Sequence, residues 1–160
     1  MRKINNYLLI FVFASVSGCA APGKVRPVSQ DYSAKKQLIH NYCYQYVYGD
    51  YGTQIDYRRA QQWCRRGADE GVASSQALLA ELHFFGQGVP QDFFRALHWY
   101  RQAAQQDHVH AQFMLYHMLS KGLGTLPDES QARQWLEQSA ASGHLRAKAL
   151  LDAGGAALVE

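Results

Sequence analysis

The sequence predicts an all-α protein, an α-solenoid in which a helix-turn-helix unit of 36 residues is repeated three times. The only three tryptophans, Trp63, Trp99 and Trp135, fall in one register. Alanine, aspartate and glycine recur at the same spacing. These positions are Ala60, Ala96 and Ala132; Ala68, Ala104 and Ala140; Asp56, Asp92 and Asp128; and Gly52, Gly88 and Gly124. A fixed period shared by several residue types is typical of stacked helical repeats.

Each repeat is expected to contain a helix A, a turn with glycine and a helix B. In the second repeat, apolar residues at helical spacing predict helix A over about residues 74–85. Gly86 and Pro90 end this helix, because glycine tolerates positive φ and proline cannot continue a helix. Asp92 can cap helix B with its side-chain oxygen, and helix B is expected to reach about residue 105.

The other two repeats follow the same plan, except that Asp50 stands where they have a helix-ending glycine. The tryptophan of each unit is expected to fill the space between repeats. Residues 146–152 restore the beginning of helix A, so they predict a short helix that caps the C-terminal end of the solenoid. The solenoid is therefore assigned to residues 35–153 and a C-terminal tail to residues 154–160.

The beginning of the chain has the layout of a signal peptide. Two basic residues precede an apolar run over residues 7–16, which is short for a spanning helix of about 20 apolar residues. The segment V-S-G-C that ends at Cys19 is similar to a bacterial lipobox, whose cysteine receives a diacylglyceryl group and becomes the N-terminus after cleavage. This resemblance implies a signal peptide over residues 1–18 and a lipid on Cys19.

An ordinary secretory signal, cleaved near Ala20 and Ala21, is the alternative. Residues 19–34 contain two prolines and a glycine and lack helical periodicity, so beyond the cysteine they are expected to form a flexible tether. Because Ala20 rather than aspartate follows the cysteine, the sorting rule of bacterial lipoproteins implies the outer membrane. The protein would then face the periplasm.

The charge balance argues against nucleic acid as a partner. The full chain has 16 Lys and Arg residues against 13 Asp and Glu residues. Removal of residues 1–18 takes away Arg2 and Lys3 and leaves a formal charge of +1. A nearly neutral chain without a polybasic run lacks the electrostatic footprint typical of nucleic-acid binding.

The order of residues within the unit is similar to the Sel1-like repeat, a relative of the tetratricopeptide repeat. The second repeat carries the motif most completely. Its matching positions are Ser75, Leu79, Ala80, Gly86, Gly88, Val89, Asp92, Ala96, Trp99, Tyr100, Ala103 and Ala104. The first repeat has Cys43 in the slot of Leu79 and Cys64 in the slot of Tyr100. Tyr44 and Tyr116 occupy a slot for glycine or alanine, so the helix pairs of the first and third repeats are expected to be splayed or to be shielded at the ends.

This resemblance implies a non-enzymatic adaptor or assembly scaffold that binds a protein partner in the cell envelope and reaches the membrane through its lipid. Two alternatives stay open. One is an enzyme or ligand-binding protein acting on cell-wall material, since some cysteine-rich relatives have been assigned penicillin-binding or β-lactamase activity. The other is a structural subunit that assembles through the ends of its solenoid.

We identify no residue pattern that favours a cofactor or a metal. Neither a G-x-S-x-G nor an H-E-x-x-H motif is present. His108 and His110 form an H-x-H pair, but no third ligand is evident nearby and a closed zinc site needs four. His83 is interpreted as a partly buried, hydrogen-bonded structural residue, and His98 and His144 as surface residues.

Cys43 and Cys64 are the cysteines left for pairing within the solenoid. They lie on helix A and helix B of the first repeat, nearly level in an antiparallel pair and in slots that are apolar elsewhere. An exported protein permits a disulfide between them, which would stabilise the fold by about 3 kcal/mol. Two buried free thiols are the alternative.

The A helices of stacked helix pairs line the concave side, so their free face is the expected partner-binding surface. Tyrosine is common at binding hot spots, where loss of one side chain costs about 2 kcal/mol. The candidates are an aromatic patch of Tyr42, Tyr48 and Phe84 beside a row of Gln45, Glu81 and His117, which share one slot of the repeat.

The lipobox resemblance gives a direct test at Cys19. We expect Cys19→Ala to stay unprocessed or become soluble, because the lipid can no longer be attached. Membrane fractionation and the mass of the mature protein would report this change. If the variant fractionates with membranes as the wild type does, the lipoprotein interpretation is wrong.

Overall fold

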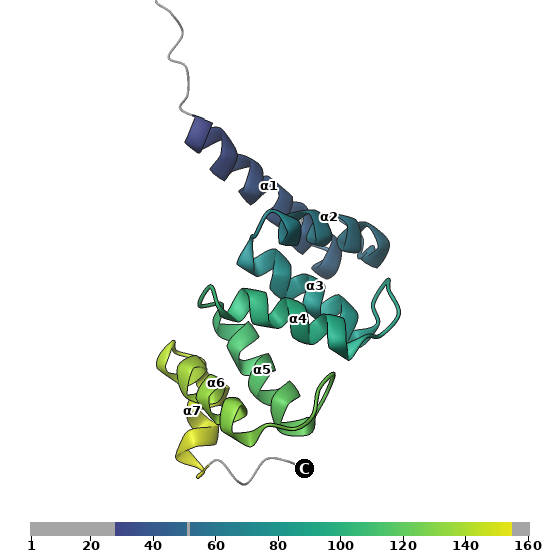
Figure 1. Ribbon diagram of the computed structural model, residues 1–160. Coiled ribbons are helices and arrows are strands. Elements are labelled where there is room, and N and C mark those ends of the chain that lie inside the picture. The colour runs from purple at the N-terminus through teal and green to yellow at the C-terminus, as the bar shows by residue number, and fades with distance from the viewer. Residues whose placement is uncertain (1–27, 51, 155–160) are drawn as a thin grey trace, which may run out of the picture.

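The computed structural model describes residues 28–50 and 52–154, which form seven helices and no strand (Figure 1). The helices are α1 (Val28–Tyr48), α2 (Tyr57–Asp69), α3 (Ala73–Phe85), α4 (Phe93–Ala104), α5 (Val109–Lys121), α6 (Glu129–Ala141) and α7 (Leu145–Asp152). Each helix packs on its neighbours along the chain, and α1 also reaches α3. The predicted all-α solenoid of three helix pairs and a capping helix is confirmed.

Aspartate begins all three B helices, as the sequence predicted. The Asp56 side chain accepts from the backbone N–H groups of Arg58 and Arg59 at 3.1 and 3.0 Å. Asp92 and Asp128 accept in the same way from residues three positions later. Such a cap satisfies a backbone donor that has no partner within the helix, and it contributes about 1 kcal/mol.

The helix-ending glycine of the first repeat lies one residue earlier than expected. Gly86 and Gly122 end α3 and α5 with φ values of 70° and 67°. In the first repeat the residue with positive φ is Gly49, at 72°, and not Asp50, which occupies the equivalent slot. The N–H of Gly49 donates to the carbonyl of Gln45 at 2.8 Å. The helix therefore ends at Tyr48, one residue short of the equivalent end of α3.

The second glycine of the turn joins one repeat to the preceding one. A Cβ atom on Gly88 would lie 2.5 Å from the backbone oxygen of Tyr57, at the beginning of α2. A Cβ on Gly124 would collide with Phe93 at the beginning of α4 in the same manner. No repeat precedes that of Gly52 in the described part of the chain, and a Cβ on Gly52 would meet nothing within 4 Å.

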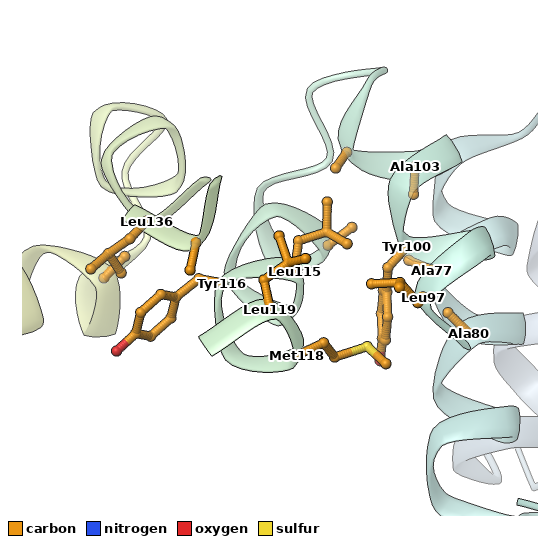
Figure 2. Close-up of a cluster of buried hydrophobic side chains, with 14 of the residues drawn as sticks. Ala77, Ala80, Leu97, Tyr100, Ala103, Leu115, Tyr116, Met118, Leu119 and Leu136 are labelled. Carbon is orange, nitrogen blue, oxygen red and sulfur yellow. The ribbon is translucent and has the colours of Figure 1, made fainter. Parts of the chain in front are cut away.

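The buried core runs along the solenoid as two clusters. Ala60, Ala96 and Ala132 are fully buried in the slot where helix B meets helix A. In the larger cluster, Met118 of α5 and Tyr100 of α4 are both fully buried (Figure 2). Trp99 packs against both clusters, which confirms that it fills the space between units.

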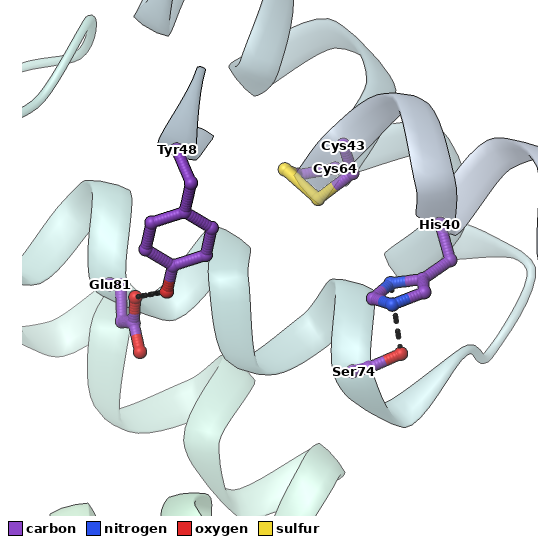
Figure 3. The surroundings of a disulfide bond; sticks show 6 residues. All are labelled: His40, Cys43, Tyr48, Cys64, Ser74 and Glu81. Carbon is purple, nitrogen blue, oxygen red and sulfur yellow. Dashed lines mark hydrogen bonds between the residues drawn. A yellow bond between two sulfur atoms is a disulfide. The ribbon is translucent and has the colours of Figure 1, made fainter. Parts of the chain in front are cut away.

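The structure joins Cys43 and Cys64 in a disulfide between α1 and α2, with Cα atoms 4.7 Å apart (Figure 3). Both residues are fully buried. The expectation of a splayed first pair is wrong, because Tyr44 is 43% exposed and stays outside the helix interface. Tyr116 is buried in the third repeat and packs with Phe113 at a ring distance of 6.0 Å.

The predicted tether is wrong over residues 28–34, which form the first two turns of α1. This part of the tether has no glycine and no proline, so helix can extend outward from the packed end of α1. The signal peptide, Cys19, the rest of the tether and residues 155–160 lie outside the described residues. None of the described helices is long and apolar enough to cross a membrane.

The two equivalent turn glycines provide a matched test of how repeats are joined. Gly52→Ala is expected to cost about 1 kcal/mol, because only the positive φ opposes the new Cβ. Gly88→Ala should cost about 2 kcal/mol more, since its Cβ also meets the backbone of the preceding repeat. Urea unfolding of the two variants measures the difference. Equal losses would contradict the proposed contact between repeats.

Candidate functional site

Two of the hollows in the described structure open along α1, α3, α5 and the capping helix α7. Every lining residue belongs to α1, α3, α5 or α7 or caps one of them. The tyrosine-histidine hollow is lined by His40, Tyr44, Tyr48, Ser74, Ala77, Leu78, Glu81, His108 and His110. The aromatic-cationic hollow is lined by Phe84, Phe85, Phe113, Met114, Tyr116, His117, Ser120, Lys121, Arg146 and Leu150.

A polar network in the first hollow connects three repeats. The Tyr48 hydroxyl donates to Oε2 of Glu81 at 3.1 Å, which joins α1 to α3 (Figure 3). The other carboxylate oxygen, Oε1, lies 3.1 Å from Nε2 of His110 on α5. Burial and the negative charge of Glu81 raise the pKa of Tyr48, so its phenol stays a hydrogen-bond donor. The network holds the exposed ring of Tyr48 in place.

Three further histidines make hydrogen bonds at the ends or edges of the A helices. Nδ1 of His40 lies 3.0 Å from the Ser74 hydroxyl, again between α1 and α3 (Figure 3). His108 and His144 share one slot of the repeat, and each caps the A helix that follows it. The Nδ1 of His108 accepts from the N–H of Ala111 at 3.3 Å, and the Nδ1 of His144 accepts from the N–H of Ala147 at 3.2 Å. Burial lowers the pKa of all three histidines, which favours the neutral rings that can accept these bonds.

The structure separates the six predicted partner-binding residues. Tyr48 and Glu81 are hydrogen-bonded in the first hollow, whereas Phe84 and His117 line the second with ring centroids 6.3 Å apart. Tyr42 stacks on Trp63 of α2 at 4.7 Å. Gln45 lines a depression that adjoins the first hollow, since His40 and Tyr44 line both.

Tyr42 therefore does not lie with Tyr48 and Phe84 in one patch. Six residues at about 100° each place it roughly 120° around the helix from Tyr48. Tyr44, four residues before Tyr48, holds the neighbouring place instead, and the two rings are 4.7 Å apart. A role in binding for any of these residues stays a prediction.

Sequence reasoning missed the C-terminal half of this face. His110, His144 and Phe113 continue the row beyond Glu81: the rings of Phe113 and His144 stack at 4.3 Å, and His110 is 6.3 Å from His144. His144 is thus a half-buried cap of α7 rather than a surface residue. The 36-residue spacing between His108 and His144 could have shown from the sequence that His144 occupies the same helix-capping position as His108.

The histidines and carboxylates of this face are held in separate contacts. Among residues 28–50 and 52–154, no group of three His, Cys, Asp or Glu side chains is placed to hold a metal ion. The H-x-H pair is divided between two tasks, since His108 caps α5 and His110 faces Glu81. His83 is buried, but its Nδ1 has no hydrogen-bond partner in the described part of the chain.

The histidines make stability depend on pH. Burial lowers the pKa of His83, His108, His117 and others, so below about pH 6.5 the unfolded chain binds protons that the folded chain does not. Stability is therefore complete above this pH and is lost as the pH falls. We expect a lower urea midpoint at about pH 5.5 than at about pH 7.5.

Two single variants test this pH dependence. His83→Gln should flatten the pH dependence, because it removes a buried group that titrates in the unfolded chain. His98→Gln is the matched control, since His98 is exposed on α4. An equal slope in both variants would contradict the role assigned to His83.

Comparisons with known proteins agree with this architecture. The Sel1 repeat family matches residues 39–72, 73–108 and 109–144. A comparison with curated proteins gives no match. Among solved structures, the chain is similar to a Sel1 repeat protein from Oxalobacter formigenes, with 27% identity and a TM-score of 0.68 over 72% of this chain and 47% of the other.

Two further structures are similar. The protective antigen c5321, present in uropathogenic Escherichia coli strains and displaying an SLR fold, is 29% identical with a TM-score of 0.67, over 74% of this chain and 26% of that one. Helicobacter pylori cysteine rich protein B shares the fold at 18% identity, with a TM-score of 0.62 over 78% of this chain and 98% of the other. This chain thus spans less than half of the first two proteins. The three family matches cover more than half of the present chain, and the protein belongs to the Sel1 repeat family.

Proposed function

We propose that this protein is a non-enzymatic scaffold that binds a protein partner on the free face of its A helices. Sel1 repeat proteins are generally scaffolds for protein-protein interaction. The observation that carries the proposal is the Tyr48, Glu81 and His110 network, which connects the A helices of three repeats around exposed aromatic rings. A partner on this face would contact three repeats together, with rings already held in place.

We further propose that the scaffold acts in the bacterial cell envelope, lipid-anchored at Cys19 on the periplasmic side of the outer membrane. The support comes from the signal-peptide layout and the lipobox-like segment that ends at Cys19. A disulfide between Cys43 and Cys64 fits an oxidising compartment, because such bonds persist mainly outside the cytosol. The Cys19→Ala fractionation decides this part of the proposal independently of partner binding.

Substitution of Tyr48 and Glu81 together should abolish partner capture. Tyr48→Ala with Glu81→Ala removes the exposed ring and the carboxylate that links α1 to α5, while the buried core is untouched. Crosslinking in cells followed by affinity purification of the full-length protein would compare the captured proteins. Helical content and melting temperature should stay close to those of the wild type.

Phe94→Ala is the matched control for this experiment. Phe94 is 73% exposed but lies on α4, a B helix outside both hollows. Its loss should leave capture intact. If the double variant retains the partner, or if Phe94→Ala loses it equally, the A-helix face is not the binding surface.

One observation favours the alternative of an enzyme or ligand-binding protein acting on cell-wall material. The hydrogen bond between Ser74 and the neutral His40 places a hydroxyl beside a base in the first hollow, as nucleophilic catalysis requires. Ser33 and Lys36 also have S-x-x-K spacing on α1, although Lys36 lies over the ring of Tyr32 at 4.7 Å. Turnover of a β-lactam that Ser74→Ala or Ser33→Ala removes would establish this alternative in place of the scaffold.

A further inference from the structure

The aromatic-cationic hollow has an apolar floor that is open to solvent. Phe85 on α3 is 59% exposed, and its ring meets that of half-buried Phe84 edge-on at 4.9 Å. Phe93 of α4 supports Phe84 from behind at 5.3 Å. Phe113 of α5 and Leu150 of α7 complete the lining on the other side. A side chain that enters here meets rings held in place by the core.

The rim of the same hollow is positive. Lys121, at the end of α5, and Arg146, in the first turn of α7, both line it, and no Asp or Glu side chain does. Neither cation forms a salt bridge within residues 28–50 and 52–154, and Arg146 rests over the ring of Phe113 at 6.0 Å. Burial, and to a smaller extent the positive charges of Lys121 and Arg146, lower the pKa of His117.

Four arginines of the B helices contrast with this pair, whereas Arg58, Arg66 and Arg101 form no salt bridge among the described residues. On the B helices, Arg59, Arg65, Arg95 and Arg133 each pair with an acid three or four residues away. In the first hollow, Glu81 faces His110. The aromatic-cationic hollow therefore combines a solvent-exposed aromatic floor with positive charge that no acid of the described chain neutralises.

We propose that this hollow binds an acidic peptide segment of the partner protein, in which an aromatic or long aliphatic side chain lies next to carboxylates. The apolar side chain would enter between Phe85 and Leu150. A carboxylate would bind Arg146 and Lys121, because guanidinium and carboxylate groups form strong paired hydrogen bonds. Charge complementarity of this kind selects the partner as well as holding it. The inference rests on the proposed scaffold function and assigns its partner chemistry.

The experiment uses a fluorescent peptide that has one phenylalanine flanked on each side by two glutamates. Fluorescence anisotropy with the full-length protein should show saturable binding that weakens as salt rises, since exposed charges are screened. A peptide with lysine in place of glutamate, and one with alanine in place of phenylalanine, should bind at least about tenfold more weakly. Failure of the wild type to bind the acidic peptide overturns the proposal.

Variants locate the binding in the second hollow. The affinity for the acidic peptide should fall by about tenfold in each of three variants, Arg146→Gln, Lys121→Gln and Phe85→Ala. Each variant loses one charge-assisted contact or one aromatic anchor. Arg101→Gln and Phe94→Ala, on the exposed side of α4, are the matched controls and should bind as the wild type does. Unchanged affinity in Arg146→Gln and Lys121→Gln overturns the proposal.

Two further outcomes separate this inference from the scaffold itself. If Tyr48→Ala with Glu81→Ala abolishes partner capture while Arg146→Gln and Lys121→Gln do not, the scaffold stands and the acidic-peptide site is wrong. If the protein binds vesicles of anionic phospholipid through Arg146 and Lys121 but not the peptide, the hollow binds a membrane surface and the proposal is overturned.

Discussion

Close contact between backbones is the constraint on which this solenoid depends. Ala60, Ala96 and Ala132 are fully buried where helix B meets helix A, because a larger side chain there would hold the two helices apart. Gly88 and Gly124 do the same between repeats, where even a Cβ atom would collide with the beginning of the preceding B helix. Small residues at a fixed period thus set both the pairing of helices and the stacking of pairs. The first described repeat has such a neighbour on one side, and a disulfide joins its own two helices.

Stacking at this distance also creates the candidate binding face. The A helices lie near enough for a single carboxylate, Glu81, to meet Tyr48 of one neighbour and His110 of the other. Side chains on the free face then line hollows instead of pointing separately into solvent. Because each hollow spans at least two repeats, a ligand in it would also hold those repeats together. Binding of such a ligand would therefore raise the stability of the folded solenoid.

The two hollows differ in their charge, and this difference suggests how the face could select a partner. In the tyrosine-histidine hollow, the carboxylate is satisfied by a phenol and an imidazole. In the aromatic-cationic hollow, Lys121 and Arg146 lie beside the exposed ring of Phe85 and the half-buried rings of Phe84 and Phe113, and no acid is among the lining residues. The first hollow therefore presents rigid aromatic surface, and the second adds positive charge. A partner with aromatic and acidic residues in one segment would match both.

The sequence by itself determined the repeat, the order of helices, the aspartate caps and the tryptophan between units, because each depends on residues within one period. The sequence also placed Cys43 opposite Cys64, because the two residues lie at nearly equal distances before and after the turn that joins their helices. The sequence did not decide where α1 begins, because helix can extend beyond a packed segment wherever no proline or glycine stops it. Nor did it separate Tyr42 from Tyr48 or bring His110 and His144 to the face. Those positions depend on how each A helix is rotated about its axis against its neighbours. Contacts between different repeats fix this rotation, so only the tertiary structure decided it.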